Sequence, residues 1–308
     1  MKISTVDMYK ISLPHRSPFK TSFGQMTSKD FILLVLHDQD GNCGYGECSA
    51  FTTPFYTEEF RDSAYLLLKD MLLPALLNQE LTAPDQLAGL FAKIRGNHMA
   101  KAAIDSAFWD LFVKRQHQSL AEAIGGIKKQ GVRLASNHLR CVLVPAVSVY
   151  VEAGYQRVKV KIKPGADYAY PKAVCDQFLR LELMADANSA YTLSDVATLQ
   201  RLDALKLLMI EQPLAADDLV QHAKLQQELK TPLCLDESIT GLAAAQTMIQ
   251  LGSGQIINIK VSRVGDQTNP SPGQDQPARL LVWGDAGVRS CPCSRHCCCI
   301  APRLHPPQ

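Results

Sequence analysis

Short apolar runs and longer helix-like segments alternate between residues 156 and 260. Each of five apolar runs carries a charged residue at its end, and these residues are Lys161, Asp186, Glu211, Asp236 and Lys260. Successive members are 25, 25, 25 and 24 residues apart. A period of this length accommodates one strand, one helix and two short loops. The pattern predicts five parallel strands joined by helices near residues 168–180, 193–202, 217–229 and 241–251.

The N-terminal part of the chain shows a different pattern. Apolar positions at 2–13, at 31–36 and from 43 onward predict a β-meander, with an Asp-Gly turn at 37–42. A polar, aromatic stretch at 17–24 is expected to be a loop able to cover a site. Apolar residues at helical spacing predict helices over 60–77, 83–94 and 98–114. Strands followed by helices indicate an α+β domain.

Two stretches interrupt the pattern. Residues 131–148 have no clean period, although a first strand is expected there if the βα repeat begins at that point. Residues 266–308 are rich in proline, cysteine and arginine, and only 278–283 has a strand-like or helix-like period. We therefore predict an α+β domain over 1–125, a βα domain over 126–265 and an atypical tail over 266–308.

Composition narrows the class of protein. The chain has 308 residues, a net charge of +2 and 46% hydrophobic residues, which is ordinary for a globular protein. The near-zero charge argues against nucleic acid as a partner, because phosphate binding requires a clustered basic face. The sequence shows no membrane-length apolar run and no signal-peptide core, so we expect a cytoplasmic protein without a membrane partner. Nothing in the composition opposes a homo-oligomer.

Ten cysteines form two groups. Five are scattered, as is typical of buried, reduced thiols in a cytosolic protein. The other five lie between Cys291 and Cys299. This cluster lacks a spaced Cys-x-x-Cys pair, so a thiolate zinc site or a redox centre is the less favoured interpretation of it.

Three acidic residues end consecutive predicted strands. The carboxyl ends of parallel strands open on one face of the sheet, so Asp186, Glu211 and Asp236 are expected to converge there. Three hard oxygen ligands suit Mg²⁺ or Mn²⁺, and the lack of histidine or cysteine at these positions disfavours Zn²⁺. Taken one at a time, each acid could instead cap the following helix. The regular period favours the metal site.

Lysines flank the three acids. If the sheet closes as an eight-stranded barrel, Lys161 and Lys260 end opposite strands and could exchange protons with a carbon acid held between them. A nearby cation would lower a lysine pKa and stabilise an enediolate beside a substrate carboxylate. Lys159 lies on the same side of its strand as Lys161, so we expect it to tune Lys161 and to contact the substrate carboxylate.

Three neighbouring residues are more ambiguous. Asn188 follows a predicted ligand by two residues and could support the ligands by hydrogen bonding. Glu237 has the opposite strand parity to Asp236 and could pair with a lysine in a structural or a functional role. Lys163 precedes Pro164-Gly165, where the strand is expected to end, and a solvated lysine is the favoured interpretation.

At these residues the sequence resembles the enolase superfamily, in its muconate-lactonising-enzyme-like branch. It is most similar to the o-succinylbenzoate synthase / N-acylamino acid racemase family. The segments that carry the resemblance in the βα part are 158–165, 184–191, 210–214, 235–238 and 257–260. Upstream, the segments 18–24, 45–48 and 98–101 look like that family's capping domain.

The resemblance implies an α+β capping domain followed by a (β/α) TIM-type barrel, which appears incomplete at its first and last strands. It implies Asp186, Glu211 and Asp236 as Mg²⁺ ligands and Lys161 and Lys260 as the acid/base pair. The loop from Pro18 to Gly24, with Phe19, Thr21 and Phe23, would close over a small carboxylate substrate. The implied reaction is the dehydration that forms o-succinylbenzoate for menaquinone synthesis, catalysed by a carbon–oxygen lyase. N-acylamino acid racemase, dipeptide epimerase and muconate-type cycloisomerase activities are the alternatives.

The chain departs from the family in the two irregular stretches. The family has a first barrel strand near 131–148 and, after 265, two further strands with a Gly-Gly-Met motif, and neither is evident here. The cysteine, proline and arginine bias of 266–308 is typical of an out-of-frame reading. We interpret both stretches as frameshifted, which makes an inactive remnant the alternative of a different class. Translating the coding DNA in all frames around codons 131 and 265 tests this interpretation.

Overall fold

A computed structural model describes residues 1–21, 24–77, 79–124, 134–137, 143–264 and 279–283. The described residues form two compact units. The first contains the N-terminal residues and the segment that begins at Lys260, and the second contains the described residues from 134 to 259 together with 279–282. The boundaries predicted near 125 and 265 fall outside the described residues.

The first unit contains an antiparallel sheet in the order β1-β2-β3. Its strands are β1 (Ile3–Thr21), β2 (Gly24–Asp38) and β3 (Cys43–Cys48). The helices are α1 (Arg61–Leu67), a π-helical turn (Leu68–Leu72), α2 (Leu73–Leu77), α3 (Gln86–Leu90), α4 (His98–Arg115) and α5 (Leu120–Ala123). The predicted meander and the three predicted helical segments are confirmed, with the second segment reduced to the short α3.

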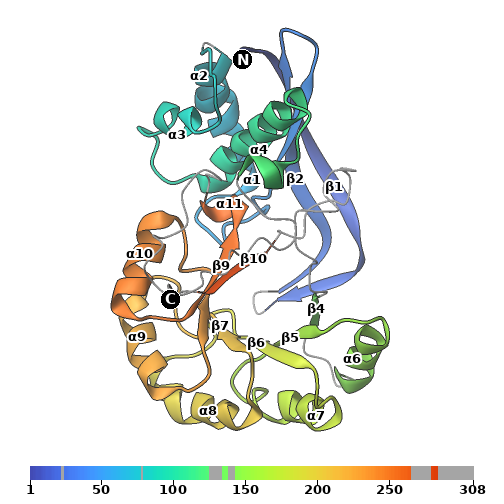
Figure 1. Cartoon of the computed structure of the whole chain (residues 1–308), viewed down its shortest axis with the longest axis vertical. Coiled ribbons are helices and arrows are strands. Elements are labelled where there is room, and N and C mark those ends of the chain that lie inside the picture. The colour runs from blue at the N-terminus through green and yellow to red at the C-terminus, as the bar shows by residue number, and fades with distance from the viewer. Residues whose placement is uncertain (22–23, 78, 125–133, 138–142, 265–278, 284–308) are drawn as a thin grey trace, which may run out of the picture. The chain divides into compact units, whose positions relative to one another are not determined.

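The prediction of a loop at 17–24 was wrong for the residues whose backbone is described, 17–21 and 24. Phe19 pairs with Met26 and Thr21 pairs with Gly24, so β1 and β2 form one long hairpin (Figure 1). The register shifts between Pro14 and Phe19, and such an irregularity disrupts the alternation on which a strand prediction depends. The side chains at 16–25 lie outside the described residues, as does Phe23.

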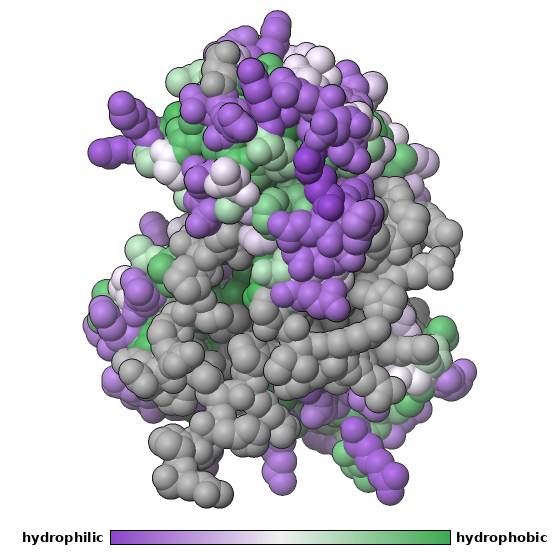
Figure 2. Space-filling view, turned by 45° about the horizontal axis from the view of Figure 1, so that its top comes forward, coloured by the Kyte–Doolittle hydropathy of each residue, from purple (hydrophilic) through white to green (hydrophobic). Residues whose placement is uncertain are grey.

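The core of the first unit lies between the sheet and α4. Ile32, Leu34 and Leu36 are fully buried at alternate positions of β2, as expected for one face of a strand. They belong to the same hydrophobic cluster as Ala103 and Ala107 of α4. Figure 2 shows hydrophilic side chains over much of the visible outer face of this unit. Among the described residues, every helix is too short or too polar to span a membrane.

Gly46 lies where β3 meets α4. A Cβ atom at this position would lie 1.9 Å from the Ala103 carbonyl oxygen, which belongs to helix backbone. We expect Gly46→Ala to destabilise the protein by about 1–3 kcal/mol or more, because neither backbone can yield. Gly89→Ala in α3 is the matched control, since nothing lies within 4 Å of its added Cβ, and it should stabilise by up to about 1 kcal/mol. Urea unfolding measures both, and equal effects of the two variants would contradict the argument.

Asp38 ends β2 and orders the turn that follows. Its carboxylate accepts hydrogen bonds from the Asn42 backbone N–H at 2.8 Å, the Asn42 side-chain amide at 3.0 Å and the Arg115 guanidinium. Burial raises the pKa of this carboxyl, but the hydrogen bonds from Asn42 and Arg115 outweigh burial and hold it at about 2 rather than the ordinary 3.8.

The lowered pKa of Asp38 predicts a pH dependence. A depressed folded-state pKa stabilises the protein above the unfolded-state pKa, and the contribution disappears as pH falls through the folded-state value. We expect Asp38 to contribute about 2 kcal/mol at pH 5 and to lose most of this between pH 4 and about pH 2. Urea unfolding of the wild type and of Asp38→Asn should show a free-energy difference that shrinks over this interval. A difference that stays constant with pH would refute the assignment.

The second unit is a parallel sheet with helices on its outer side (Figure 1). The strand order is β10-β9-β8-β7-β6-β5-β4. The strands are β4 (Leu134–Asn137), β5 (Arg157–Lys161), β6 (Glu182–Asp186), β7 (Met209–Glu211), β8 (Leu233–Leu235), β9 (Ile256–Lys260) and β10 (Arg279–Trp283). The main helices are α6 (Leu143–Glu152), α7 (Ala169–Gln177), α8 (Val196–Gln200), α9 (Leu219–Glu228) and α10 (Leu242–Leu251). Short 3₁₀ turns, Leu193–Asp195 and Arg201–Leu205, flank α8. A short helix, α11 (Val261–Val264), follows β9 and belongs to the first unit.

The five predicted strands and the four helices between them are confirmed. No convincing strand was predicted in 131–148, and this prediction was wrong for part of that stretch. Residues 134–137 form β4, which pairs in parallel with 157–160 of β5, and α6 follows. A four-residue edge strand that contains serine and asparagine has too few apolar positions to show a period. In the tail, β10 coincides with the one stretch that had a regular period, and the rest lies outside the described residues.

The two faces of this sheet differ. Val158, Val160, Ala185 and Ile210 join the cluster that packs against the helices. On the other face, Met184, Met209, Cys234 and Ile256 form a separate buried cluster. Charged residues replace these apolar side chains at the carboxyl ends of the strands. Burial on both faces explains why the strands read as nearly continuous apolar runs.

Candidate active site

Three of the predicted residues lie level with one another at the carboxyl edge of the sheet. Lys161 is the register partner of Asp186, and Asp186 is the register partner of Glu211. The hydrogen-bonded ladder continues past these residues, with Ala187 N–H donating to the Glu211 carbonyl at 2.9 Å and Gln212 N–H donating to the Cys234 carbonyl at 2.8 Å. Residues in register on parallel strands point to the same face, so the ladder brings one lysine and two carboxylates together.

Lys159 is the buried cation of this cluster. Its ammonium lies 2.7 Å from Asp186 Oδ2 and 2.9 Å from Glu211 Oε2, and the residue is 6% exposed. Burial lowers the pKa of Lys159, but the carboxylates of Glu211 and Asp186 outweigh burial and raise it above the ordinary value. Lys159 is therefore held as a charged partner of two carboxylates. Its predicted contact with a substrate carboxylate stays a prediction.

Lys161 is more accessible. Its side chain is 18% exposed, and its ammonium lies 2.6 Å from Asp186 Oδ2 and donates to Asn188 Oδ1. Burial raises the pKa of Asp186, but the neighbouring ammonium groups of Lys159 and Lys161 outweigh burial and lower it. Asp186 therefore stays ionised, and the amine of Lys161 beside it is partly accessible.

Asn188 lies at the turn after β6. Its N–H donates to Asp186 Oδ1 at 3.2 Å, and its side-chain amide donates to Glu237 Oε1 at 3.0 Å. Its φ of 43° is in the left-handed region, which asparagine tolerates better than most residues. The predicted supporting role of Asn188 thus corresponds to hydrogen bonds with Asp186, Lys161 and Glu237.

Glu211 and Asp236 are deeply buried, as is Asp186. Glu211 is 0% exposed and accepts a hydrogen bond from the Asn258 side-chain amide at 3.0 Å. Asp236 is 1% exposed, and its backbone N–H donates to Gln212 Oε1 at 2.9 Å. Burial raises the pKa of the Cys234 thiol in β8, and the carboxylates of Glu211, Asp236 and Asp186 raise it further.

Two of these residues were missed by the sequence reasoning. Gln212 has a φ of 39° and accepts from the backbone N–H groups of Asp236 and Ser238, so it fixes the end of β8 against the end of β7. Asn258 interrupts the apolar run of β9 two residues before Lys260. A buried polar residue at that parity is the signal that could have identified Asn258, because buried amides require partners.

The residue types fit a divalent cation, although the described side chains are not arranged around one. Among the described residues, no group of three histidine, cysteine or acidic side chains lies close enough to hold a metal ion. The Lys159 ammonium instead lies between Asp186 and Glu211. The carboxylates of Asp186, Glu211 and Asp236 are nevertheless all buried, and they are hard oxygen donors of the type that Mg²⁺ or Mn²⁺ prefers.

The remaining predicted residues are Lys260, Phe19, Thr21 and Phe23. Lys260 ends β9, and its ammonium donates to the Tyr56 hydroxyl at 2.8 Å, a contact within the first unit. Phe19 and Thr21 belong to β1, but their side chains lie outside the described residues, as does the whole of Phe23. Their predicted contacts with a substrate stay predictions.

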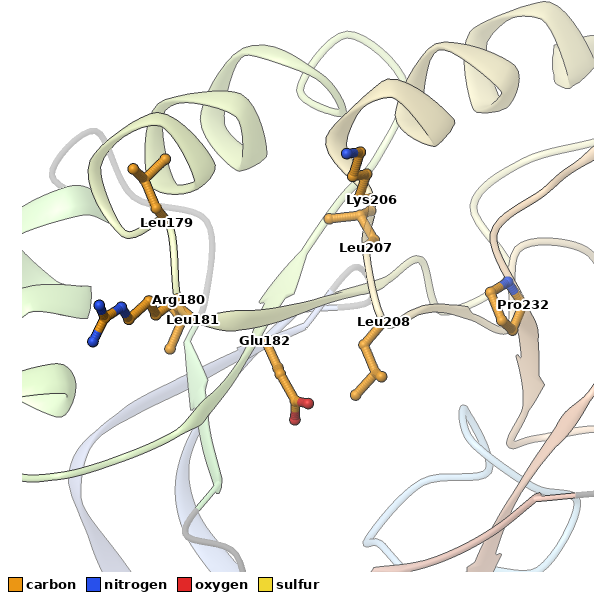
Figure 3. A pocket seen from close by; sticks show the side chains of 8 residues that line it. All are labelled: Leu179, Arg180, Leu181, Glu182, Lys206, Leu207, Leu208 and Pro232. Atoms are coloured by element: carbon orange, nitrogen blue, oxygen red, sulfur yellow. The ribbon is translucent and has the colours of Figure 1, made fainter.

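A pocket in the second unit lies at the opposite end of the same strands. It is lined by residues that precede or begin β6, β7 and β8, which are Leu179, Arg180, Leu181, Glu182, Lys206, Leu207, Leu208 and Pro232 (Figure 3). These residues are at the amino ends of the strands, whereas Asp186 and Glu211 end them. The pocket is therefore separate from the charged cluster.

An α+β unit and a parallel βα sheet with lysines and carboxylates at its carboxyl edge define an enolase-type enzyme. Family models support this class, because residues 3–125 match the mandelate racemase / muconate lactonizing enzyme N-terminal domain and residues 143–269 match the enolase C-terminal domain-like family. The chain belongs to the mandelate racemase / muconate lactonizing enzyme family of the enolase superfamily. Members of this family are enzymes that generally use a divalent metal ion.

The chain is similar to curated relatives over most of its length. It is 47% identical to an o-succinylbenzoate synthase of Geobacillus kaustophilus, with 86% of this chain and 72% of the relative covered. It is 43% identical to an N-succinylamino acid racemase of Thermus thermophilus, with the same shares covered. A crystal structure of an enolase superfamily member from Listeria innocua matches with a TM-score of 0.84 and 42% identity, covering 87% of this chain and 73% of that one. The predicted family and fold class are confirmed.

Proposed function

We propose that this chain is an o-succinylbenzoate synthase. The reaction removes water from 2-succinyl-6-hydroxy-2,4-cyclohexadiene-1-carboxylate and leaves the aromatic o-succinylbenzoate. The observation that carries the proposal is the cluster of Lys161, Asp186 and Glu211, in register at the carboxyl edge of a parallel sheet. Relatives that are named for this activity and are 42–47% identical to the chain support the choice of substrate.

One lysine both takes up a proton from the substrate and returns it to the leaving group. Neutral Lys161 takes the proton from the carbon that bears the carboxylate, and the electron pair of that C–H bond moves toward the carboxylate. The electron pair then forms the ring double bond as the C–O bond to the hydroxyl group breaks. The Lys161 ammonium gives its proton to the leaving oxygen, so water departs and the lysine is neutral again. The ammonium of Lys260 stabilises the negative charge of the intermediate.

We propose Asp186, Glu211 and Asp236 as the residues that hold Mg²⁺ or Mn²⁺. A bound cation would supply positive charge beside the substrate carboxylate, where negative charge develops. The described neighbours of these carboxylates hold two of them in place. The lysine ammonium groups lower the pKa of Asp186, and Asn258 donates a hydrogen bond to Glu211.

The direct test is an assay of the purified full chain. With Mg²⁺, loss of the cyclohexadiene absorbance and formation of o-succinylbenzoate are expected, and both should stop when a chelator removes the metal. No turnover by a folded, Mg²⁺-loaded chain would overturn the proposal. If turnover appears only when a family C-terminus replaces residues 266–308, the chain is an inactive remnant of such an enzyme.

A second candidate activity is racemisation of N-succinylamino acids. Relatives in Thermus thermophilus and Amycolatopsis that are named for this activity are 43% and 39% identical to the chain. In this chemistry Lys161 and Lys260 would each exchange a proton with one enantiomer. Incubation of each enantiomer of an N-succinylamino acid in D₂O, followed by NMR of the α-proton, tests for it.

A further inference from the structure

The amide of Asn188 lies between a cation and an anion. Its Oδ1 accepts a hydrogen bond from the Lys161 ammonium, and its Nδ2 donates to Glu237 Oε1 at 3.0 Å. An ammonium can only donate and an ionised carboxylate can only accept. Only one of the two amide orientations satisfies both neighbours. The carboxylate of Glu237 therefore holds the amide in the orientation that turns Oδ1 toward Lys161, and it does so whether or not Lys161 carries its proton.

The backbone on both sides of this contact is fixed. Ser189, which follows Asn188, donates its N–H to the Gln212 carbonyl at 2.7 Å. The residues on either side of Glu237 are held by Gln212 as well, because Asp236 and Ser238 donate their backbone N–H groups to Gln212 Oε1 at 2.9 and 3.2 Å. Gln212 thus holds the turn after β6 beside the end of β8. The hydrogen bond between Asn188 and Glu237 joins these same two segments.

We propose that Glu237 is a positioning residue for Lys161. It acts through Asn188, and the amide oxygen then directs the Lys161 amine. The described hydrogen bond of Lys260 goes to the Tyr56 hydroxyl, whereas Lys161 donates to Asn188 Oδ1. The inference rests on the proposed function, in which Lys161 moves a proton, and it adds a selective role for a residue outside the acid/base pair and the predicted ligands.

The first test follows the two lysines separately. Loss of the α-proton of an N-succinylamino acid into D₂O requires a different lysine for each enantiomer. Glu237→Gln allows the Asn188 amide to face either way, because glutamine both donates and accepts. We expect this variant to slow exchange of one enantiomer by about 10- to 100-fold, through kcat and with little change in KM, and to leave the other within about two-fold. Glu237→Asp, which keeps the acceptor, should recover part of the loss.

A double-mutant cycle shows whether the effect passes through Asn188. If it does, Asn188→Ala should slow the same enantiomer, and adding Glu237→Gln should cost little more. Glu182→Gln is the matched control. It removes a glutamate that pairs with Arg157 at the amino end of β6, and both enantiomers should exchange at the wild-type rate.

The second test needs no activity. In an NMR spectrum of the full chain labelled with ¹⁵N-asparagine, the signal of the Asn188 side-chain amide is identified because it disappears in Asn188→Asp. We expect an amide pair protected from hydrogen exchange in the wild type and unprotected in Glu237→Gln. An unchanged Asn188 amide in Glu237→Gln, or equal slowing of both enantiomers, overturns the inference. Absence of exchange by a folded wild type instead overturns the racemase chemistry, while the amide spectrum still decides whether Glu237 anchors Asn188.

Discussion

Replacing Lys161 with methionine is expected to reduce dehydration by about 10²- to 10⁴-fold while the protein stays folded. The amine of Lys161 is the most accessible cation of the described cluster, and it lies beside Asp186 and Asn188. Asp186 keeps Lys159 as its partner in the variant, so no buried carboxylate is left alone. Steady-state assays with Mg²⁺, together with thermal unfolding, measure the two effects separately.

Lys163→Met is the matched control for Lys161. Lys163 lies two residues further on, has the same parity and is exposed after the end of β5. Its loss should change the rate by less than about two-fold, since no described contact ties it to the cluster. Small primary amines added to Lys161→Ala should restore part of the activity, because they can occupy the space of the lost side chain. Equal losses at 161 and 163 would show that charge alone, rather than a positioned amine, is required.

Replacing Glu211 with leucine is expected to cost about 3–5 kcal/mol of stability. Glu211 is fully buried and accepts hydrogen bonds from Lys159 at 2.9 and 3.1 Å and from Asn258 at 3.0 Å. Its removal leaves the buried ammonium of Lys159 with one carboxylate partner instead of two. Breaking a buried ion pair from one side is costly because the remaining charge cannot be solvated.

The double variant Lys159→Met/Glu211→Leu separates this cost from the loss of packing. Removing both charges should restore most of the stability, because the ammonium that lost its Glu211 partner is also removed. Urea unfolding of the wild type, the two single variants and the double variant gives the coupling free energy directly. Glu182→Leu is the surface control, and the loss of its exposed pair with Arg157 should cost less than about 1 kcal/mol. A double variant as unstable as Glu211→Leu would refute the buried-charge explanation.

The strand-end residues were predictable because their signal is local and repeated. Lys161, Asp186 and Glu211 each end an apolar run at a fixed period, and a parallel sheet brings such positions to one edge. The same reasoning assigned the strands and helices of the second unit nearly to their observed ends. It could not assign β4, since a four-residue edge strand has too few positions for a period, nor the end of the β1–β2 hairpin.

The partners inside the cluster could not be predicted from spacing. Lys159 was expected to tune Lys161 and to contact a substrate carboxylate, and its bridge between Asp186 and Glu211 was not predicted. The length and direction of a lysine side chain are set by tertiary packing, which a strand period does not encode. Gln212 was missed for a related reason. Its role depends on a left-handed backbone at the end of β7 and on N–H groups supplied by β8.

The burial of Cys234 has a practical consequence. Its thiol is 0% exposed in the middle of β8, packed in the cluster that contains Met184 and Met209, and its pKa is raised by burial and by the nearby carboxylates. A thiol of this kind reacts with alkylating reagents only when its surroundings open, because the thiolate is the reactive form. The rate at which Cys234 is alkylated therefore reports how often the sheet around the charged cluster opens. A ligand that binds at the cluster should stabilise the closed sheet and slow the alkylation of Cys234.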